Sequence, residues 1–515
     1  MSQKSGASQP RAFVERPAFL LLYAAVAAIT LFSRFFTRAP LLAFYDDDFF
    51  YYLKIAQNIV LQGRSSFDGI HVTNGYHPLW ELAVTVLYAI FRSRFFFVAL
   101  QSVTFAAAIA CYIGAERVFQ HLETESRIRG LLTLVISLQC LVLFRGGMEI
   151  ILTLPLGIWL LALLMSTDVS RWKQFALGFL ASLVVLSRLD AIFLVGLLLL
   201  GWIWNSPQRA VKQLPRFLSG TALFPIYLAF NQLAFHSMLP VSGHAKQLKT
   251  NLLPSLRGPL SVAFPLNYTK LVFVWPCLLL FVVGVFYITA NRRDVSRKQL
   301  AFCRALFLFP VVQLLALSLV SDWPLWGWYF YPLVFSSIAG FATLGLFRSR
   351  SAQTQLFESA AALFGFVVVV FLIGYSIIGP ANAPSYAVSV QVAEFINEHP
   401  GVYAMGDRAG AVGYLTNQPI IQLEGLVMDP TYLTKIRRSE PLPQILKDYG
   451  VEYYIALLGP LPPARHCFEF REPSQAGPSS RVSLGETCAS PIASFSDVGA
   501  TFHIFHADTI GIATR

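Results

Sequence analysis

Long apolar runs separated by short polar segments dominate the first three quarters of the chain. Phe19–Phe32, Phe95–Ile113 and Phe364–Ile378 contain no charged residue at all. A helix that crosses a bilayer needs about 20 mainly apolar residues. The pattern predicts eleven membrane-spanning helices, at 17–36, 95–116, 130–145, 150–166, 175–187, 191–204, 217–235, 271–290, 305–320, 329–347 and 357–378. The first run is too long for the core of a cleaved signal peptide, so we expect it to remain as a span.

The pattern changes at about Pro380, where polar residues become frequent. Ser385–Glu398 and Leu442–Tyr449 have the composition of helices, whereas Val402–Met405, Ile420–Leu423 and Glu452–Leu457 resemble strands. Alternating strands and helices predict an α/β domain. We therefore expect a membrane domain over 1–379 and a soluble domain over 380–515. The glycine-rich segment 406–413 weakly resembles a nucleotide-binding loop but lacks the G-x-G-x-x-G pattern.

The first predicted outer loop, 37–94, is too long to be a simple connection. Phe49, Tyr52, Leu53, Ala56 and Val60 recur at helical spacing, with polar residues between them. This spacing predicts an amphipathic helix lying on the membrane surface. A second apolar stretch, 78–91, is shorter than a full span and predicts a re-entrant or interfacial segment.

Composition excludes a water-soluble protein. Hydrophobic residues make up 55% of the 515 positions and charged residues only 13%, about half the charged share of an ordinary soluble domain. The net charge of +11 could suggest nucleic acid as a partner, but its distribution argues against one. Six segments predicted to face the cytoplasm hold 18 Lys and Arg in 71 residues, whereas the 108 residues of the outer loops hold 10.

This asymmetry follows the positive-inside rule. It predicts a multi-pass protein of the inner, cytoplasmic membrane of a bacterium, with a cytoplasmic N-terminus and an extracytoplasmic C-terminal domain. Cys111, Cys140, Cys277 and Cys303 lie in or beside apolar runs and are expected to pack as small hydrophobic residues. The remaining two, Cys467 and Cys488, can pair if their domain faces an oxidising compartment.

Three consecutive aspartates, Asp46, Asp47 and Asp48, are the clearest candidate for chemistry. Carboxylates beside a membrane must reach water, a cation or a wet cavity. They can also cap a helix that begins near Phe49, which requires only one of them. Capping and catalysis are both open for this run.

Other polar residues at the predicted outer ends of spans also have two interpretations. Asn74-Gly75 and His77-Pro78 are turn signals. Glu149 can pair locally with Arg145, and Arg188 with Asp190.

The first outer loop resembles that of bacterial GT-C membrane glycosyltransferases, a superfamily that includes protein O-mannosyltransferases, aminoarabinose transferases and arabinosyltransferases. The resemblance is carried by Asp47–Asn58, by Phe67-Asp68-Gly69 and by Thr73–Trp80. Looser matches are Gly147–Glu149, Ser187–Asp190 and Leu239–Lys246.

The resemblance implies transfer of a sugar, usually with inversion, from a polyprenyl-phosphate donor to a glycan, lipid or protein acceptor outside the cytoplasm. An acceptor hydroxyl needs a positioned base, and the resemblance makes Asp47 the first choice, with Asp48 and Glu149 in support. A departing phosphate needs donors and cations. The substrate-binding residues expected on this basis are Lys54, His77, Arg188, His244, Lys246, Trp328 and Tyr329.

No cofactor is required by this scheme, although a divalent metal held by Asp46 and Asp48 is a further option. A transporter or flippase of lipid-linked sugars is an alternative, but the chain shows no paired interrupted helices in matching halves. An inactive scaffold for envelope assembly is a second alternative, because a fold does not guarantee activity.

Overall fold

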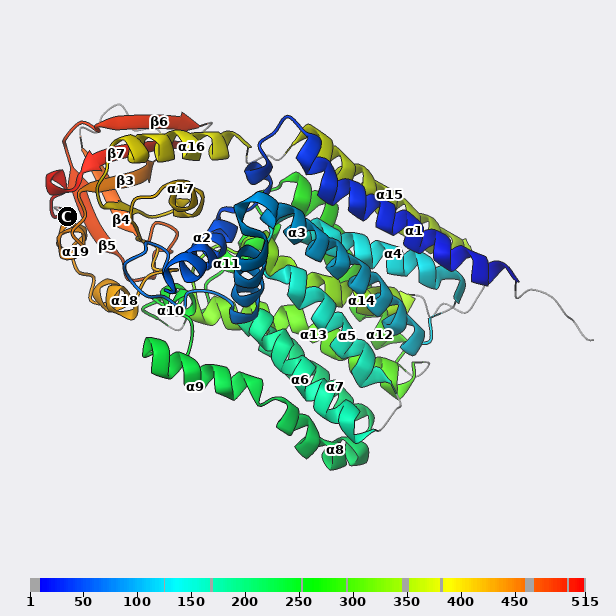
Figure 1. The fold of residues 1–515 in the computed structure, drawn as a ribbon. Coiled ribbons are helices and arrows are strands. Elements are labelled where there is room, and N and C mark those ends of the chain that lie inside the picture. Colours follow the sequence, from blue (N-terminus) through cyan, green and yellow to red (C-terminus); the bar gives the residue numbers. More distant parts are fainter. Residues whose placement is uncertain are drawn as a thin grey trace, which may run out of the picture.

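The computed structural model describes residues 10–124, 126–166, 170–251, 253–292, 295–344, 352–379, 383–458, 467–497 and 500–513. Parts of the predicted cytoplasmic segments, at 1–9, 167–169, 293–294 and 348–351, lie outside these residues, as does the predicted domain boundary at Pro380. The described residues form a helical bundle with a small sheet domain at one end (Figure 1).

The helices of the membrane domain account for most of the predicted spans. They are α1 (Pro10–Phe32), α2 (Asp47–Gln62), α3 (Pro78–His121), α4 (Ser126–Leu143), α5 (Ile150–Met165), α6 (Arg171–Ser187), α7 (Ile192–Asn205), α8 (Pro207–Gly220), α9 (Leu223–Phe235), α10 (Val241–Lys246), α11 (Arg257–Ala263), α12 (Trp275–Ala290), α13 (Arg297–Val320), α14 (Pro332–Leu344) and α15 (Ala352–Ile378).

Seven helical segments within the described ranges are long and apolar enough to cross a membrane: Pro17–Phe36, Pro78–His121, Ile128–Gly146, Pro207–Phe235, Lys270–Ala290, Arg297–Val320 and Glu358–Ile378. Three shorter apolar helices, Ile150–Met165, Trp172–Ser187 and Leu189–Asn205, coincide with further predicted spans. The protein is therefore a multi-pass membrane protein. The count of eleven spans stays a prediction.

The stretch predicted as a separate apolar segment, 78–91, is the first part of α3. Arg92 has a left-handed backbone (φ 52°) and divides this segment from the spanning part of the helix. Leu82, Val86 and Ile90 are exposed at four-residue spacing, which places one apolar stripe on the outside of the bundle. This arrangement agrees with contact to lipid.

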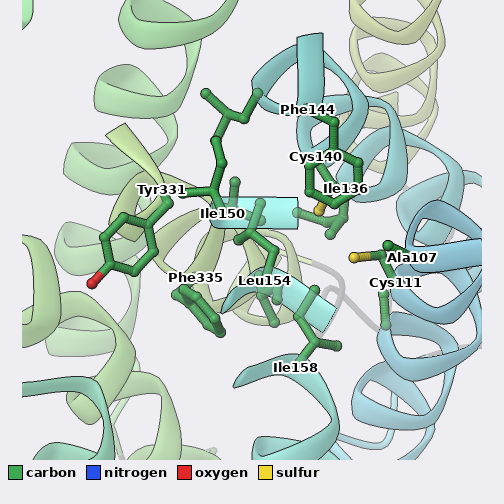
Figure 2. Packing of buried hydrophobic residues seen from close by; sticks show 14 of the residues in the cluster. Ala107, Cys111, Ile136, Cys140, Phe144, Ile150, Leu154, Ile158, Tyr331 and Phe335 are labelled. Carbon is green, nitrogen blue, oxygen red and sulfur yellow. The ribbon is translucent and has the colours of Figure 1, made fainter. Parts of the chain in front are cut away.

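The core of the bundle is centred on α5, most of whose residues are buried. Figure 2 shows Ile150, Leu154 and Ile158 of this helix among side chains from α3, α4 and the start of α14. Cys111 and Cys140 are part of this packing, and all four unpaired cysteines of the described residues are buried. They fill space as small hydrophobic residues, as predicted.

The C-terminal domain has the expected α/β fold. It also contains further strands that the sequence pattern did not predict. Its elements are α16 (Ala383–Glu398), β1 (Tyr403–Met405), α17 (Ala409–Leu415), β2 (Ile420–Gln422), α18 (Pro430–Arg437), α19 (Leu442–Asp448), β3 (Tyr453–Leu458), β4 (Phe468–Glu472), β5 (Ser483–Thr487), β6 (Ala493–Asp497) and β7 (Ala500–His506).

Five strands form one sheet in the order β2-β1-β3-β7-β6. The first three are parallel, with Tyr403 between Ile420 and Tyr453, and β7 joins β3 in antiparallel register. The other two strands, β4 and β5, form an antiparallel pair. The predicted disulfide between Cys467 and Cys488 is confirmed, with Cα atoms 4.1 Å apart.

The predicted amphipathic helix exists as α2, but its expected position on an open membrane surface is wrong. One side of α2 packs on α3 and the other on α17 of the C-terminal domain (Figure 1). Phe49, Phe50, Tyr51 and Ile55 are all buried. Two opposite faces of α2 are apolar, so the helix is enclosed between the domains, where its polar residues meet protein groups.

Candidate active site

A cleft of about 470 Å³, part of it open to solvent, lies where α2, the bundle, α10 and the C-terminal domain meet. Its lining combines ionisable, aromatic and apolar side chains: Asp48, Tyr51, Tyr52, Ile55, Gly75, Tyr76, His77, Met148, Glu149, Ser242, Lys246, Trp328, Tyr329, Leu426 and Val427. Six of the predicted site residues are therefore brought together here. They are Asp48, His77, Glu149, Lys246, Trp328 and Tyr329.

Asp48 is the aspartate of the acidic run that lines the cleft. Its side chain is half-buried, and no hydrogen bond from the described residues engages it. Burial raises the pKa of Asp48 to about 7, with Asp47 and Asp46 adding to the rise and Lys246 opposing it. Asp48 is therefore a carboxylate that no described residue hydrogen-bonds, and its pKa is near neutrality.

A buried ion network forms the floor of the cleft. Arg188 donates to Glu149, and its Nε lies 2.8 Å from Oδ1 of Asp190. The guanidinium stacks 4.3 Å from the ring centre of Tyr329, and Tyr52 donates its hydroxyl to Glu149 at 3.3 Å. A buried charge is strongly destabilising unless it is paired and hydrogen-bonded, and the charges of this network are paired in this way. The local pairing of Glu149 with Arg145 is replaced by the longer-range pairing with Arg188.

His77 connects this network to the first outer loop. Its Nδ1 lies 3.3 Å from the backbone N–H of Leu189 and accepts from it, so the ring proton of the neutral imidazole is on Nε2. Nε2 lies 3.8 Å from Glu149. Burial lowers the pKa of His77 to about 4. The imidazole is therefore neutral at physiological pH and presents a donor toward the cleft.

Lys246 of α10 supplies a cation to the lining of the cleft. Its Nζ donates to the Tyr329 hydroxyl at 2.8 Å, and no carboxylate of the described residues lies within salt-bridge distance of it. The short helix α10 that carries it is held by Asn74, whose Oδ1 accepts from the N–H of Val241 at 3.0 Å. The Asn74-Gly75 dipeptide, which predicts a turn, also positions this cation.

Asp47 points to the other side of α2, away from the cleft. Its carboxylate accepts hydrogen bonds from the backbone N–H groups of Gly410 and Ala411 at 2.9 and 2.8 Å. It thereby caps the N-terminus of α17, where an anion is favoured. At the C-terminal end of α17, the carbonyl oxygen of Thr416 accepts a hydrogen bond from Lys54 of α2 at 2.9 Å. Asp47 and Lys54 thus clamp α17 at its two ends.

Two further predicted residues are also outside the cleft. Asp46 packs against Gly146, where an added Cβ would lie 1.7 Å from its Oδ2. His244 is on α10 but does not line the cleft, and Arg437 of the C-terminal domain lies near enough to lower its pKa, second to burial. Two N–H groups of the glycine-rich segment 406–413, those of Gly410 and Ala411 in the first turn of α17, are therefore occupied by the Asp47 carboxylate.

A divalent metal needs several ligand atoms around one point. Within the described ranges, no group of three or more His, Cys, Asp or Glu side chains is placed to hold one. The two aspartates suggested as metal ligands, Asp46 and Asp48, differ in surroundings, since only Asp48 lines the cleft. Metal dependence stays untested.

The C-terminal domain contributes to the cleft, which no pattern in the sequence predicts. Leu426 and Val427 close one side of the cleft, and the hydroxyl of Thr73 donates to the Met428 carbonyl at 2.9 Å. A Cβ on Gly75 would lie 1.9 Å from the Leu426 carbonyl oxygen, so glycine is required for this close approach. Nothing in the polar sequence around these two apolar residues indicates that they return to the membrane domain.

Comparison with known proteins identifies the fold. No protein-family model matches the chain, and no curated protein matches it in sequence. ArnT from Cupriavidus metallidurans, solved with undecaprenyl phosphate, matches 96% of this chain and 98% of its own at 12% identity and a TM-score of 0.53.

Two other solved structures are similar over most of the chain. The archaeal oligosaccharyltransferase AglB from Archaeoglobus fulgidus, in complex with an inhibitory peptide and a dolichol-phosphate, shows 12% identity over 86% of this chain and 69% of its own, with a TM-score of 0.48. The mycobacterial arabinofuranosyltransferase AftD shows 15% identity over 85% of this chain and 35% of its own, with a TM-score of 0.47. The likeness to ArnT alone gives this chain a GT-C fold, as the first outer loop predicted.

Proposed function

We propose that this GT-C-fold protein is a glycosyltransferase that moves a sugar from a polyprenyl-phosphate donor to an acceptor hydroxyl in the cleft. The observation that carries the proposal is that Asp48 of α2 and Lys246 of α10 line the same cleft, with Lys246 close enough to oppose the rise in the Asp48 pKa. A base and a cation so placed match the two charges that develop when a phosphate leaves and a hydroxyl attacks. The bound undecaprenyl phosphate of ArnT supports a lipid phosphate as the donor group.

Asp48 is the general base in this scheme, in place of Asp47. A base must reach the proton it removes, and Asp47 is occupied by two N–H groups of α17. The pKa of Asp48, about 7, leaves a useful fraction ionised at neutral pH while keeping the carboxylate basic. Attack by the deprotonated hydroxyl in one displacement inverts the sugar carbon, and the proton remains on Asp48.

The leaving phosphate takes up negative charge beside Lys246. Arg188 is already compensated by Glu149 and Asp190, so its role is to hold Glu149 and the floor of the cleft. Neutral His77 donates from Nε2, and Trp328 and Tyr329 offer an aromatic wall for the sugar or the first isoprene units. The acceptor enters between Asp48 and the apolar edge formed by Leu426 and Val427.

Transfer from defined donors tests the proposal. Purified protein in lipid nanodiscs is incubated with radiolabelled polyprenyl-phosphate sugars and a membrane extract that supplies acceptors. We expect release of polyprenyl phosphate together with a labelled product from at least one donor. Movement of intact donor across proteoliposome membranes, without cleavage of the sugar–phosphate bond, would instead support a flippase and contradict the proposal.

A further inference from the structure

A second cavity lies in the helical bundle, away from the C-terminal domain. It encloses about 580 Å³, part of it open, and we refer to it as the distal pocket. Its lining comes from the five helices α5, α6, α7, α8 and α13, and it includes Gln174, Arg209 and Lys298. Figure 1 shows α8, which carries Arg209, toward the end of the bundle opposite the sheet domain.

The electrostatics of the distal pocket favour an anion. Arg209 and Lys298 line it, and no carboxylate of the described residues lies within salt-bridge distance of either. Burial lowers the pKa of Lys298, and the charge of Glu123 partly opposes this. Both cations are in the first turns of their helices, α8 and α13. Gln174 belongs to the first turns of a third helix, α6. Helix N-termini carry partial positive charge and attract anions.

One buried polar group in the distal pocket lacks a partner. Gln174 is only 3% exposed, yet its Oε1 makes no hydrogen bond with any of the described residues. An unpaired buried acceptor destabilises the folded state. A carboxamide lining a cavity is therefore suited to a ligand that brings a hydroxyl group.

The lining of the distal pocket combines polar and apolar side chains. Arg209, Gln213 and Asn205 are among the polar ones, and Leu163, Leu177 and Trp202 are among the apolar ones. The neighbouring Trp204 is 46% exposed, and Arg304 lies 5.0 Å from its ring centre. Tryptophan and arginine side chains of this kind concentrate where headgroups meet acyl chains.

We propose that the distal pocket binds an anionic phospholipid whose phosphodiester meets Arg209 and Lys298 and whose headgroup hydroxyl donates to Gln174. A phosphatidylglycerol has both a phosphodiester and a headgroup hydroxyl, and its acyl chains suit the apolar lining residues. Two segments that predict the cytoplasmic side, 205–216 and 291–304, contribute lining residues to this pocket, as does Gln174 at the end of a third, which places the ligand in the leaflet opposite the cleft. Basic pockets between helices on that side are able to bind lipid headgroups.

Native mass spectrometry of the full-length protein, with added lipids, tests this site without requiring enzymatic activity. We expect phosphatidylglycerol to bind at least about tenfold more tightly than phosphatidylcholine. The Arg209→Gln/Lys298→Gln double variant should lose that preference. Lys212→Gln, an exposed cation on the same helix that does not line the pocket, should keep it. Equal binding of the two lipids, or an unchanged preference in the double variant, would overturn the proposal.

Competition separates a lipid from a soluble phosphate ester. Glycerol phosphate and inorganic phosphate should displace phosphatidylglycerol only at concentrations at least about 10² higher, because they lack the acyl chains. Displacement at equal concentration would overturn the assignment to a lipid.

Gln174→Leu should reduce the advantage of phosphatidylglycerol over phosphatidic acid, and an unchanged ratio would contradict the headgroup contact. Melting temperatures in phosphatidylcholine alone verify folding. If the double variant fails this check, the single variants Arg209→Gln and Lys298→Gln replace it, each expected to weaken the preference.

Discussion

The first turn of α2 has two sides with opposite properties. On one side, Asp47 is held by two backbone N–H groups and joins the membrane domain to the C-terminal domain. On the other side, Asp48 lines a cleft without a hydrogen bond from the described residues. The two carboxylates are adjacent in sequence, share an element and both have raised pKa values, about 6 and about 7.

Hydrogen-bond partners, and not proximity in sequence, distinguish the capping role of Asp47 from the role of base that we propose for Asp48. A carboxylate whose lone pairs are engaged by a helix N-terminus has little capacity left to accept a substrate proton. A carboxylate facing a wet cleft keeps that capacity.

The largest effect is expected for loss of the free carboxylate. Asp48→Asn keeps the size of the side chain but removes its basicity, so turnover should fall by about 10²–10⁴. Asp47→Asn is the matched control, because Asn is nearly as good a cap as Asp, and it should retain most of the activity. Transfer rates with saturating donor measure both, and the reverse ranking would assign the base to Asp47.

Removal of the disulfide should lower the stability of the C-terminal domain without changing the cleft between this domain and the membrane domain. The Cys467→Ser/Cys488→Ser variant opens a loop with a sequence separation of 21, which should cost about 3 kcal/mol of stability. Chemical denaturation followed by a probe in the C-terminal domain measures this loss. Activity well below the unfolding midpoint should stay near wild type, whereas a large loss would show that domain stability sets the cleft geometry.

A smaller effect is expected where the C-terminal domain meets the cleft. Gly75→Ala places a Cβ against the Leu426 carbonyl and should displace the apolar edge, lowering kcat/KM by roughly 10- to 10²-fold. Gly196→Ala is the control, because its added Cβ would meet nothing within 4 Å. Equal kinetics for the two variants would remove Leu426 and Val427 from the site.

The smallest effect should come from weakening the cap. Asp47→Ala removes both hydrogen bonds to α17 and should cost about 0.5–2 kcal/mol. Hydrogen exchange at Gly410 and Ala411 should become faster, whereas exchange on the distant strand β7 should not change. Unaltered exchange at α17 would contradict the capping role.

Much of this organisation is readable from sequence because apolar periodicity reports burial directly. The apolar helices of the membrane domain, the first strands and helices of the C-terminal domain, α2 and the disulfide pair were all expected from composition and spacing. The split between Asp47 and Asp48 does not, because it depends on Gly410 and Ala411, more than 360 residues away in the chain. The closure by Leu426 and Val427 is likewise a tertiary contact that no local pattern encodes.

The pH dependence of transfer tests the central claim most directly. A base acts only when deprotonated, so kcat/KM should rise with pH and level off above the Asp48 pKa of about 7. In Asp47→Asn the rising limb of this pH profile should remain and move to lower pH, because the negative charge of Asp47, which raises the Asp48 pKa, is gone. In Asp48→Asn the residual activity should lack the limb. A limb that survives in Asp48→Asn but vanishes in Asp47→Asn would contradict the account.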